Sequence, residues 1–324
     1  MHHALVPFNL PDEHEQYVID TLVTTSLNGI DTHGVQLLET YIRELQGGRC
    51  KPRPNLAFTS TAPATGILDA DDALGVVAAN EAIKRAVALA RQSGVSAISV
   101  TNSNHCGAAG YYATLAARSG MIGLVFTNSD ALVAPFNGLI ALNGTNPIAM
   151  SAPGLGDEVF SLDASTSQTS FLKALRAASA DGESISGDSR EKALREPLKP
   201  LGGYKGQGLG MMVQIFGAVL TGMPFDHQLS NMYDAPYNKG RKIGHSFICL
   251  DINTFMPLAS FRARLSELLH IFRNSPPADP SSPVIVPGDA ERRAHEKRVN
   301  EGLPLSDNVW TFMEPHVEAV RYSG

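Results

Sequence analysis

Cysteine is scarce in this chain, which has three cysteines among its 324 residues. Cys50, Cys106 and Cys249 cannot all pair with one another, and none lies in a Cys-x-x-Cys or comparable zinc-ligand spacing. These absences argue against a disulfide-stapled secreted scaffold and against a cysteine-based metal site, so we expect no metal. The simplest interpretation is a reducing compartment, and we expect the cytoplasm.

Long apolar runs and a basic bias are also missing. The longest apolar stretch, Leu209–Leu220, is interrupted by Gln214 and Gly217 and is too short to span a bilayer. The first residues lack the charged start and long apolar core of a signal peptide. A formal net charge of −6 and a pI near 5.9 argue against general polyanion binding. We therefore expect neither a membrane nor a nucleic-acid partner.

Neither of the two common nucleotide-binding motifs is present. No G-x-G-x-x-G follows an N-terminal strand, and no G-x-x-x-x-G-K-[ST] occurs. The glycine-rich segment Gly206-x-Gly208-x-Gly210 lies deep in the chain, where it opens a predicted helix, and it lacks the third spacing. A standard Rossmann dinucleotide site and a P-loop are therefore excluded.

The hydrophobic pattern that is present predicts an α/β protein. Val95–Val100 is a short β-branched run, Gly107–Arg118 has helical spacing, and Ile122–Phe126 is a second apolar run. This order indicates a βαβ unit with two parallel strands. Two further strands are predicted at Val159–Leu162 and Phe247–Leu250. Helices are predicted over 11–28, from Thr32 to 46, and at Asp72–Gln92, Phe171–Ala180, Gln207–Leu220, Phe261–Phe272 and Glu291–Asn300.

Polar side chains follow three of the predicted strands. Asn104 and His105 follow the first strand, Asn128 and Ser129 follow the second, and Asp163 follows the strand that ends at Leu162. Ligands bind at the carboxyl edge of a parallel sheet, so these residues converge if their strands run side by side. Beyond Asp163, a helix is expected to open at Ser165, Thr166 and Ser167.

Two histidines and one lysine are the strongest candidates for chemistry. His105 can move a proton near neutral pH, as carbonyl reduction requires. His33 is expected in the first turn of a helix capped by Thr32, where the positive helix end disfavours the imidazolium and attracts anions. Lys205 lies between glycines at another predicted helix start, where its ammonium could meet a phosphate or carboxylate.

Each of these features also has a purely structural interpretation. A His-Gly pair at a helix start is more often structural, and a lone lysine is more often a solvated surface residue. Asp163 and Thr166 could simply cap a helix. Cys106, beside His105, could be the nucleophile of a thiol hydrolase, although no partner motif supports it. From the residues alone, the chain is an α/β protein with a site for an anionic ligand.

Seven segments, in order, resemble the malate/L-lactate dehydrogenase-like oxidoreductases, which include ureidoglycolate dehydrogenase, sulfolactate dehydrogenase and diketogulonate reductase and are distinct from the Rossmann-fold lactate and malate dehydrogenases. These segments are GIDTHGV (29–35), SNHCGAAGYY (103–112), GLVFTNS (123–129), NGTNPIAMSAP (143–153), LDASTS (162–167), LGGYKGQGLGMMV (201–213) and VPGD (286–289).

The resemblance implies a mixed sheet with flanking helices, a non-Rossmann site for NAD or NADP, and a homodimer. It implies hydride transfer between the cofactor and C2 of a small 2-hydroxy or 2-oxo acid such as malate, lactate or ureidoglycolate. His105 then corresponds to the proton donor and acceptor, and His33 to a substrate-positioning or alternate acid residue. The positions that match cofactor contacts are Ser129, Asp163, Ala164, Ser165, Lys205, Pro287, Gly288 and Asp289. We expect a helical substrate and dimerisation region, 1–65 plus 255–324, and an α/β cofactor region, 66–254.

Two departures from the family pattern support an alternative function. Many members carry an arginine four residues after the first histidine, suited to a bidentate grip on a carboxylate, and this chain has Leu37 there. Arg43 lies further along the helix and on a different face. The connection Asp181–Lys199 is short and lacks tryptophan. The alternative is a catalytically impaired nicotinamide- or acid-binding protein on the same fold.

Overall fold

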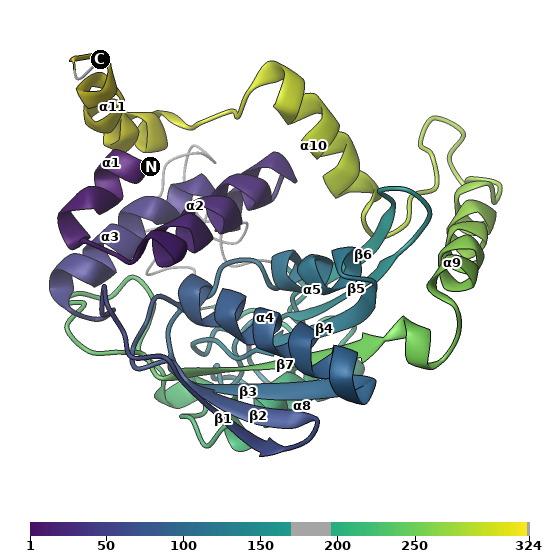
Figure 1. Ribbon diagram of the computed structural model, residues 1–324, viewed down its shortest axis with the longest axis horizontal. Helices are drawn as coiled ribbons and strands as arrows, with labels where there is room; N and C mark the ends of the chain where they lie inside the picture. The colour runs from purple at the N-terminus through teal and green to yellow at the C-terminus, as the bar shows by residue number, and fades with distance from the viewer. Residues whose placement is uncertain (170–195, 323–324) are drawn as a thin grey trace.

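A seven-stranded mixed sheet forms the centre of the structure, a computed structural model that describes residues 1–169 and 196–322 (Figure 1). The strand order is β1-β2-β3-β7-β4-β5-β6. The strands are β1 Ala57–Ala62, β2 Thr65–Asp69, β3 Val95–Ser103, β4 Met121–Thr127, β5 Ile148–Pro153, β6 Val159–Ala164 and β7 Ile243–Asp251. The expected α/β class with a mixed sheet and flanking helices is confirmed.

The predicted pairing of the first two strands is wrong in one respect. β3 and β4 do not pair with each other, because β7 lies between them and runs antiparallel to both. β3 and β4 therefore still point the same way, and β6 does so too, because β5 is antiparallel to both β4 and β6. The carboxyl ends of β3, β4 and β6 thus lie along the same edge of the sheet, the edge formed by strand ends. The expected convergence survives although the simple βαβ pairing does not.

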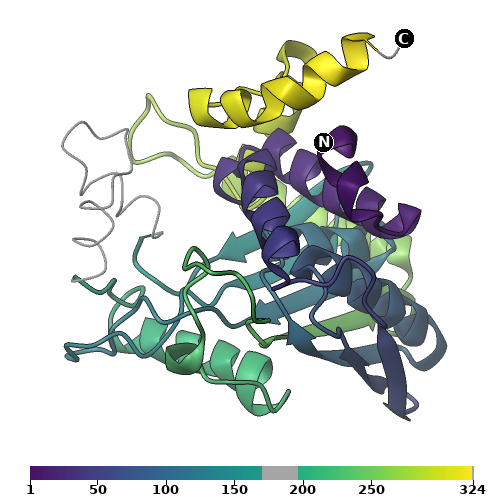
Figure 2. The same ribbon diagram turned by 90° about the vertical axis from the view of Figure 1, so that its left-hand side faces the viewer.

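Helices cover both faces of the sheet. Helix α4 (Gly75–Ser93) packs on β3 and β7, and α5 (Ala109–Arg118) packs on β4, β5 and β6. On the other face lie α8 (Tyr204–Gln214) and the π-helical turn Ile215–Val219 that continues it (Figures 1 and 2). The inward face of α4 is largely alanine and is fully buried, so the helix packs close to the strands.

The remaining helices come from the two ends of the chain. They are α1 His2–Leu5, α2 Asp12–Leu27, α3 Leu38–Gly47, α9 Leu258–Arg273, α10 Asp289–Glu301 and α11 Asp307–Tyr322. Helix α11 contacts α1, and α10 contacts α2, so the chain ends lie together, whereas α9 lies apart from them (Figure 1). The division into regions 1–65 plus 255–324 and 66–254 stays a prediction. Within the described ranges, no helix is long and apolar enough to cross a membrane.

Of two helices predicted near functional positions, one begins later than expected and the other lies outside the described residues. The helix expected after Thr32 begins only at Leu38, after two short 3-10 turns, Asp31–His33 and Val35–Leu37. Gly34 separates the turns, and the Val35 N–H donates to Ser26 Oγ (2.9 Å), which ties this segment to the end of α2. His33 is therefore not in the first turn of an α-helix. The predicted helix Phe171–Ala180 and most of the connection 181–199 lie outside the described residues.

Candidate active site

Three aromatic side chains from separate parts of the sequence meet at the sheet edge. His33 comes from the 3-10 turn after α2, Tyr41 from α3, and His105 from the loop after β3. The two imidazole rings stack with their centroids 5.6 Å apart at 26°. The Tyr41 hydroxyl lies 3.1 Å from Nδ1 of His105, and the Thr32 hydroxyl lies 2.8 Å from Nδ1 of His33. The structure thus brings together both histidines predicted from the sequence.

Burial keeps both imidazoles neutral. It lowers the pKa of His33 to about 4. It also places the pKa of His105 well below the usual value, and electrostatic repulsion lowers this pKa further, from His33 and His245 when they are protonated and from the permanent charge of Arg241. The expectation that His33 rests unprotonated therefore holds, but the cause is desolvation and not a helix dipole. Both residues keep part of their surface accessible, so a ligand can reach them.

The contacts of His105 define its tautomer. The Gly107 N–H donates to Nδ1 (3.3 Å), so in the resting neutral ring Nδ1 is an acceptor and the proton lies on Nε2. The Tyr41 hydroxyl can donate to Nδ1 of the neutral ring and accept from Nδ1–H of the imidazolium. Such a partner suits a group that changes protonation during a reaction. Tyr41 was not identified from the sequence, although a buried tyrosine hydroxyl needs a partner.

The backbone at His105 lies directly against the first residue of α4. A Cβ on Gly75 would overlap the carbonyl oxygens of Asn104 and His105. The side chain of Asn104 donates from Nδ2 to the carbonyl of Ala73 (2.9 Å) and accepts at Oδ1 from the Arg241 N–H (2.9 Å). Glycine at 75 therefore permits the helix and the histidine loop to approach.

Substitution of Gly75 by alanine is expected to lower the free energy of unfolding by about 1–3 kcal/mol, the usual range for an overpacked site. The His105 loop must move to admit the methyl group, so any activity should fall with stability. Urea denaturation measures the first effect. The control is Gly208→Ala, because a Cβ at Gly208 would meet no atom within 4 Å. Equal stability of G75A and wild type would contradict the close approach.

His245, which had no role assigned from the sequence, connects the ends of two strands. It lies on β7 with Nδ1 2.7 Å from the Thr127 hydroxyl and Nε2 2.8 Å from the Ser103 hydroxyl. Burial lowers the pKa of His245 to about 3, so the ring stays neutral. The ladder between β3 and β7 shifts register between Val100 and Ser103. The imidazole therefore fixes the irregular end of β3, two residues before His105.

A second polar cluster surrounds Ser129 after β4. The Ser129 N–H donates to Asn146 Oδ1 (3.2 Å), and the Thr145 N–H donates to Ser129 Oγ (3.1 Å). The Thr166 N–H donates to the Thr145 carbonyl (2.8 Å), so the segment after β6 joins the same cluster. The buried carboxylate of Asp226 holds this region by accepting from Gly144 N–H and Asn146 Nδ2, both at 2.7 Å. Asp226 was not identified from the sequence.

Asp163 lies within β6 and not after it. Its Oδ2 accepts from the Gly110 N–H (2.8 Å), so the carboxylate caps α5 from a neighbouring strand. Burial raises the pKa of Asp163 to about 6, against the lowering effect of the Gly110 hydrogen bond. Ser165–Ser167 do not open a helix as far as the described residues reach. Ala164 ends β6, and the Thr166 hydroxyl donates to the carbonyls of Thr145 and Asn146.

Lys205 lies in the first turn of α8, as expected, and is exposed. The helix is preceded by Gly203, whose φ of +72° favours glycine. The Leu201 N–H donates to the Thr166 carbonyl (2.9 Å), which places the start of α8 beside the segment after β6. Lys205 therefore lies at the same edge as Asp163 and Ser165.

Pro287, Gly288 and Asp289 lie beside β6. The Ser161 N–H donates to the Pro287 carbonyl (3.3 Å), and Gly288, with φ of +101°, precedes α10. The Asp289 carboxylate accepts from Arg273 Nη2 (2.8 Å) and Nε. Burial acts to raise the pKa of Asp289, but the hydrogen bonds from Arg273 and from the Val286 N–H outweigh it and hold this pKa below the usual value. The Asp289 side chain is thus committed to an ion pair.

Three further residues named from the sequence have structural roles and do not join the site. Leu37 is 3% exposed and packs in the main core. Arg43 is exposed and pairs with Glu39 on its own helix, so it does not replace the missing arginine. Cys106 is buried, and burial raises its thiol pKa to about 12. A thiol that resists ionisation is a poor nucleophile, which argues against the hydrolase hypothesis.

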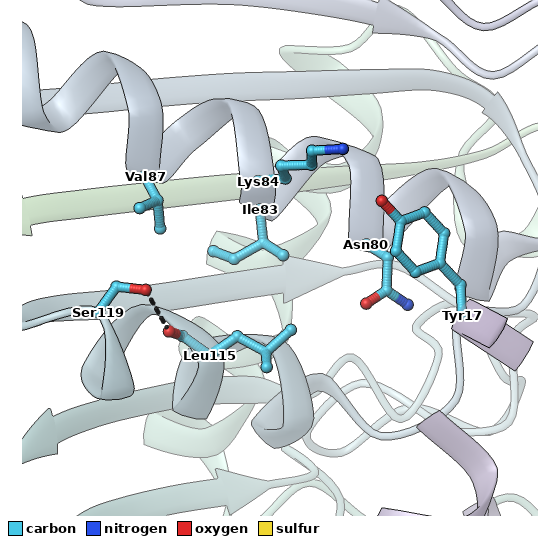
Figure 3. A pocket seen from close by; sticks show the side chains of 7 residues that line it. All are labelled: Tyr17, Asn80, Ile83, Lys84, Val87, Leu115 and Ser119. Atoms are coloured by element: carbon cyan, nitrogen blue, oxygen red, sulfur yellow. Dashed lines mark hydrogen bonds between the residues drawn. The ribbon is translucent and has the colours of Figure 1, made fainter. Parts of the chain in front are cut away.

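A surface pocket lies between α2, α4 and α5, away from these residues (Figure 3). Its lining is Tyr17, Asn80, Ile83, Lys84, Val87, Leu115 and Ser119. In Figure 3 the apolar side chains of Ile83 and Leu115 lie between the two helices, and the Ser119 hydroxyl donates to the Leu115 carbonyl. None of the predicted site residues lines it. The candidate site is therefore defined by its side chains and not by this pocket.

Comparison with known proteins identifies the family. The family model described as malate/L-lactate dehydrogenase matches residues 1–314, and the chain belongs to this family. Ureidoglycolate dehydrogenase (NAD(+)) of Escherichia coli K12 is 33% identical over 94% of this chain and 89% of its own length. Malate dehydrogenase of Pyrococcus abyssi is 34% identical over 94% and 88%. The resemblance seen in the sequence is confirmed.

Solved structures agree with this assignment. Malate dehydrogenase from Pyrococcus horikoshii OT3 superimposes with a TM-score of 0.86 at 31% identity, covering 98% of this chain and 91% of that one. Sulfolactate dehydrogenase from Methanocaldococcus jannaschii gives a TM-score of 0.84 at 31% identity, covering 95% and 91%. The chain is accordingly a dehydrogenase, an oxidoreductase that acts on a CH–OH group.

Proposed function

We propose that this enzyme transfers a hydride between NAD or NADP and C2 of a small 2-hydroxy or 2-oxo acid, with His105 as the proton donor and acceptor. The observation that carries the proposal is the pairing of His105 Nδ1 with the Tyr41 hydroxyl at 3.1 Å beside a stacked His33. A proton must reach or leave the substrate oxygen when hydride moves at carbon. A partly accessible imidazole with a hydroxyl behind it is suited to that step.

The side chains at the sheet edge fit a nicotinamide dinucleotide. Hydroxyls of Ser129, Thr145 and Ser165 suit ribose and amide groups, and the ammonium of Lys205 suits a phosphate. Asp163 is a carboxylate whose pKa burial raises to about 6, and a cationic nicotinamide ring would stabilise its charge. When bound, the cofactor supplies or accepts the hydride. The backbone at Pro287–Asp289, beside β6, would border the same site.

The two histidines would have different roles at the substrate. His105 would exchange the proton with the substrate oxygen at Nε2. The imidazolium gives up its Nε2 proton and becomes the neutral ring with its other proton on Nδ1, donated to the Tyr41 hydroxyl, and the reverse reaction returns the proton to Nε2. His33 stacks against it and positions the substrate oxygen or carboxylate, with its own Nδ1 held by Thr32. The low pKa of both rings keeps them neutral at pH 7, so the bound substrate's charge is what shifts the proton equilibrium of His105.

The proposal is tested by following NADH and NADPH absorbance with a panel of 2-oxo acids, cyclic imino acids and ureidoglycolate. We expect turnover of at least one acid with one of the two cofactors. The alternative is a catalytically impaired binding protein on this fold, and the buried Leu37 in place of an arginine is the observation that favours it. Cofactor binding by fluorescence without turnover of any panel member would support that alternative.

We propose in addition that the enzyme is a homodimer in the cytoplasm. The three cysteines are unpaired and buried, as a reducing compartment allows. Exposed apolar side chains gather on the outer surface of α8 and its π-helical extension, with more in the loop 136–142. The exposed large apolar residues on α8 and its extension are Tyr204, Leu209, Met211, Ile215 and Val219, and the exposed Leu220 follows them. An apolar surface of this kind on one helix marks a protein contact.

The double substitution Met211→Glu, Ile215→Glu is expected to convert the dimer to monomers, because two charges would have to be buried at the contact. Sedimentation velocity measures the change in mass. Leu155→Glu, at an equally exposed leucine between β5 and β6, is the control and should leave the mass unchanged. A double variant that stays dimeric would place the contact elsewhere.

A further inference from the structure

Arg241 is a buried arginine held rigidly beside the histidine loop. It lies just before β7 and is 3% exposed. Its backbone N–H donates to Oδ1 of Asn104, the residue before His105 (2.9 Å). Its guanidinium donates from Nε to the Ser230 carbonyl (3.0 Å) and from Nη2 to Asp130. Two nitrogens of the fork are thereby fixed in place.

The third nitrogen of this guanidinium has no partner among the described residues. Nη1 is buried and makes no hydrogen bond there. A buried cationic donor left unpaired is costly, and native structures satisfy nearly all such groups. The orphaned Nη1 therefore points to a missing acceptor, and an anion would satisfy it best.

The location of this charge fits the reaction. The positive charge of Arg241 acts on His105 and on Glu44 of α3, so the guanidinium lies within electrostatic range of the histidine cluster. At the position where many family members carry a carboxylate-binding arginine, this chain has Leu37, which packs in the core. Arg43 is exposed and paired with Glu39. A 2-oxo acid would otherwise lack an arginine to hold its carboxylate.

We propose that Arg241 binds the substrate carboxylate through Nη1 and so replaces, from the segment before β7, the arginine that is absent at Leu37. This inference rests on the proposed function and adds to it the group that orients the acid. A carboxylate fixed there, with its C2 oxygen toward His105, selects 2-oxo and 2-hydroxy acids over neutral ketones and amides. Asp130 and Ser230 keep the fork from turning away.

A purely structural role makes a different prediction. Arg241 could serve only to neutralise Asp130 and the buried Glu44, and its removal would then weaken folding without a specific effect on acids. The double variant Arg241→Met, Asp130→Asn separates the two roles, because it removes the buried charge pair together and leaves no unpaired Asp130.

The test measures binding of oxalate, a planar analogue of a 2-oxo acid, to the enzyme saturated with NADH, using calorimetry. Oxamide is the neutral comparison ligand. The variants are Arg241→Met, Arg241→Lys and the double variant, with Arg43→Met as the matched exposed arginine. We expect oxalate affinity to fall about 100-fold in both variants that carry methionine at 241, and about tenfold in R241K, which keeps the charge but loses the fork. The NADH dissociation constant and oxamide binding should stay within about twofold of wild type, and R43M should match wild type throughout.

Wild-type oxalate affinity in the double variant would overturn the inference. A second result would also overturn it: R241M loses both NADH and oxalate binding, and the double variant restores both fully. That result would show that Arg241 serves only as part of a structural ion pair. If wild type binds oxalate through Arg241 but turns over no acid in the panel, the proposed function fails and the carboxylate site stands.

Discussion

Replacing His105 with glutamine is expected to lower kcat by about 1,000-fold while the dissociation constant of the cofactor stays within about twofold of wild type. General acid–base catalysis contributes about 10²–10⁴-fold, and His105 has the Tyr41 hydroxyl as a partner on Nδ1. Glutamine keeps a polar group of similar reach but cannot take up or release the proton. Steady-state kinetics with the best acid of the panel, and cofactor fluorescence titration, measure the two quantities.

The control for this substitution is His270→Gln, at an exposed histidine on α9 that contacts Asn274 and lies outside the cluster. It should leave kcat unchanged. Turnover that survives in H105Q but disappears in His33→Gln would exchange the roles of the two stacked rings. Full activity in both variants would remove histidine from the chemistry altogether.

Replacing Asp163 with asparagine is expected to raise the free energy of unfolding by about 2 kcal/mol at pH 8 and to leave it unchanged near pH 4. The pKa of Asp163 is raised from 3.8 to about 6 by burial, so the folded state favours the neutral acid. The contribution of Asp163 to the free energy of unfolding is therefore present at low pH and is lost as pH rises through about 6. The full shift corresponds to about 3 kcal/mol, and the partial exposure of the residue reduces this.

Asparagine suits this comparison because its Oδ1 can still accept from the Gly110 N–H, so the cap on α5 is kept. Urea denaturation of both proteins between pH 4 and pH 8 gives the difference. Oxidised cofactor should bind more weakly to D163N, because the carboxylate no longer balances the nicotinamide charge. A D163N variant that is less stable than wild type at pH 8 would contradict the desolvation of this carboxylate.

Local pattern predicted four of the seven strands, β3, β4, β6 and β7, and most of the long helices. It did not predict β1, β2, β5 or α11, and it could not predict which strands are neighbours. The β-branched run at 95–100 and the apolar run at 122–126 each became a strand, with α5 between them. β7, far along the chain, pairs between them through two ladders of antiparallel hydrogen bonds. Its sequence shows a buried strand but not its partners, since pairing depends on contacts between distant segments.

The candidate site was predicted in part, and the missing parts have a common cause. His33 was found beside Gly34 at a predicted helix start, and His105 was found between a predicted strand and a predicted helix. Tyr41, Arg241 and Asp226 were missed because their function depends on partners far away in the sequence. His33 was expected at a helix start, but Gly34 and the Ser26 hydroxyl hold the chain in a 3-10 turn. Composition and spacing do not encode such contacts.

The central claim, hydride transfer to C2 of a 2-oxo acid, is tested most directly by isotope transfer. The enzyme is given the best acid of the panel and reduced cofactor deuterated at C4 of the nicotinamide, and the product is examined by mass spectrometry and NMR. We expect one deuterium at C2 of the hydroxy acid and none exchanged with water. A product that carries hydrogen from solvent at C2, or no product with any acid of the panel, would contradict the account.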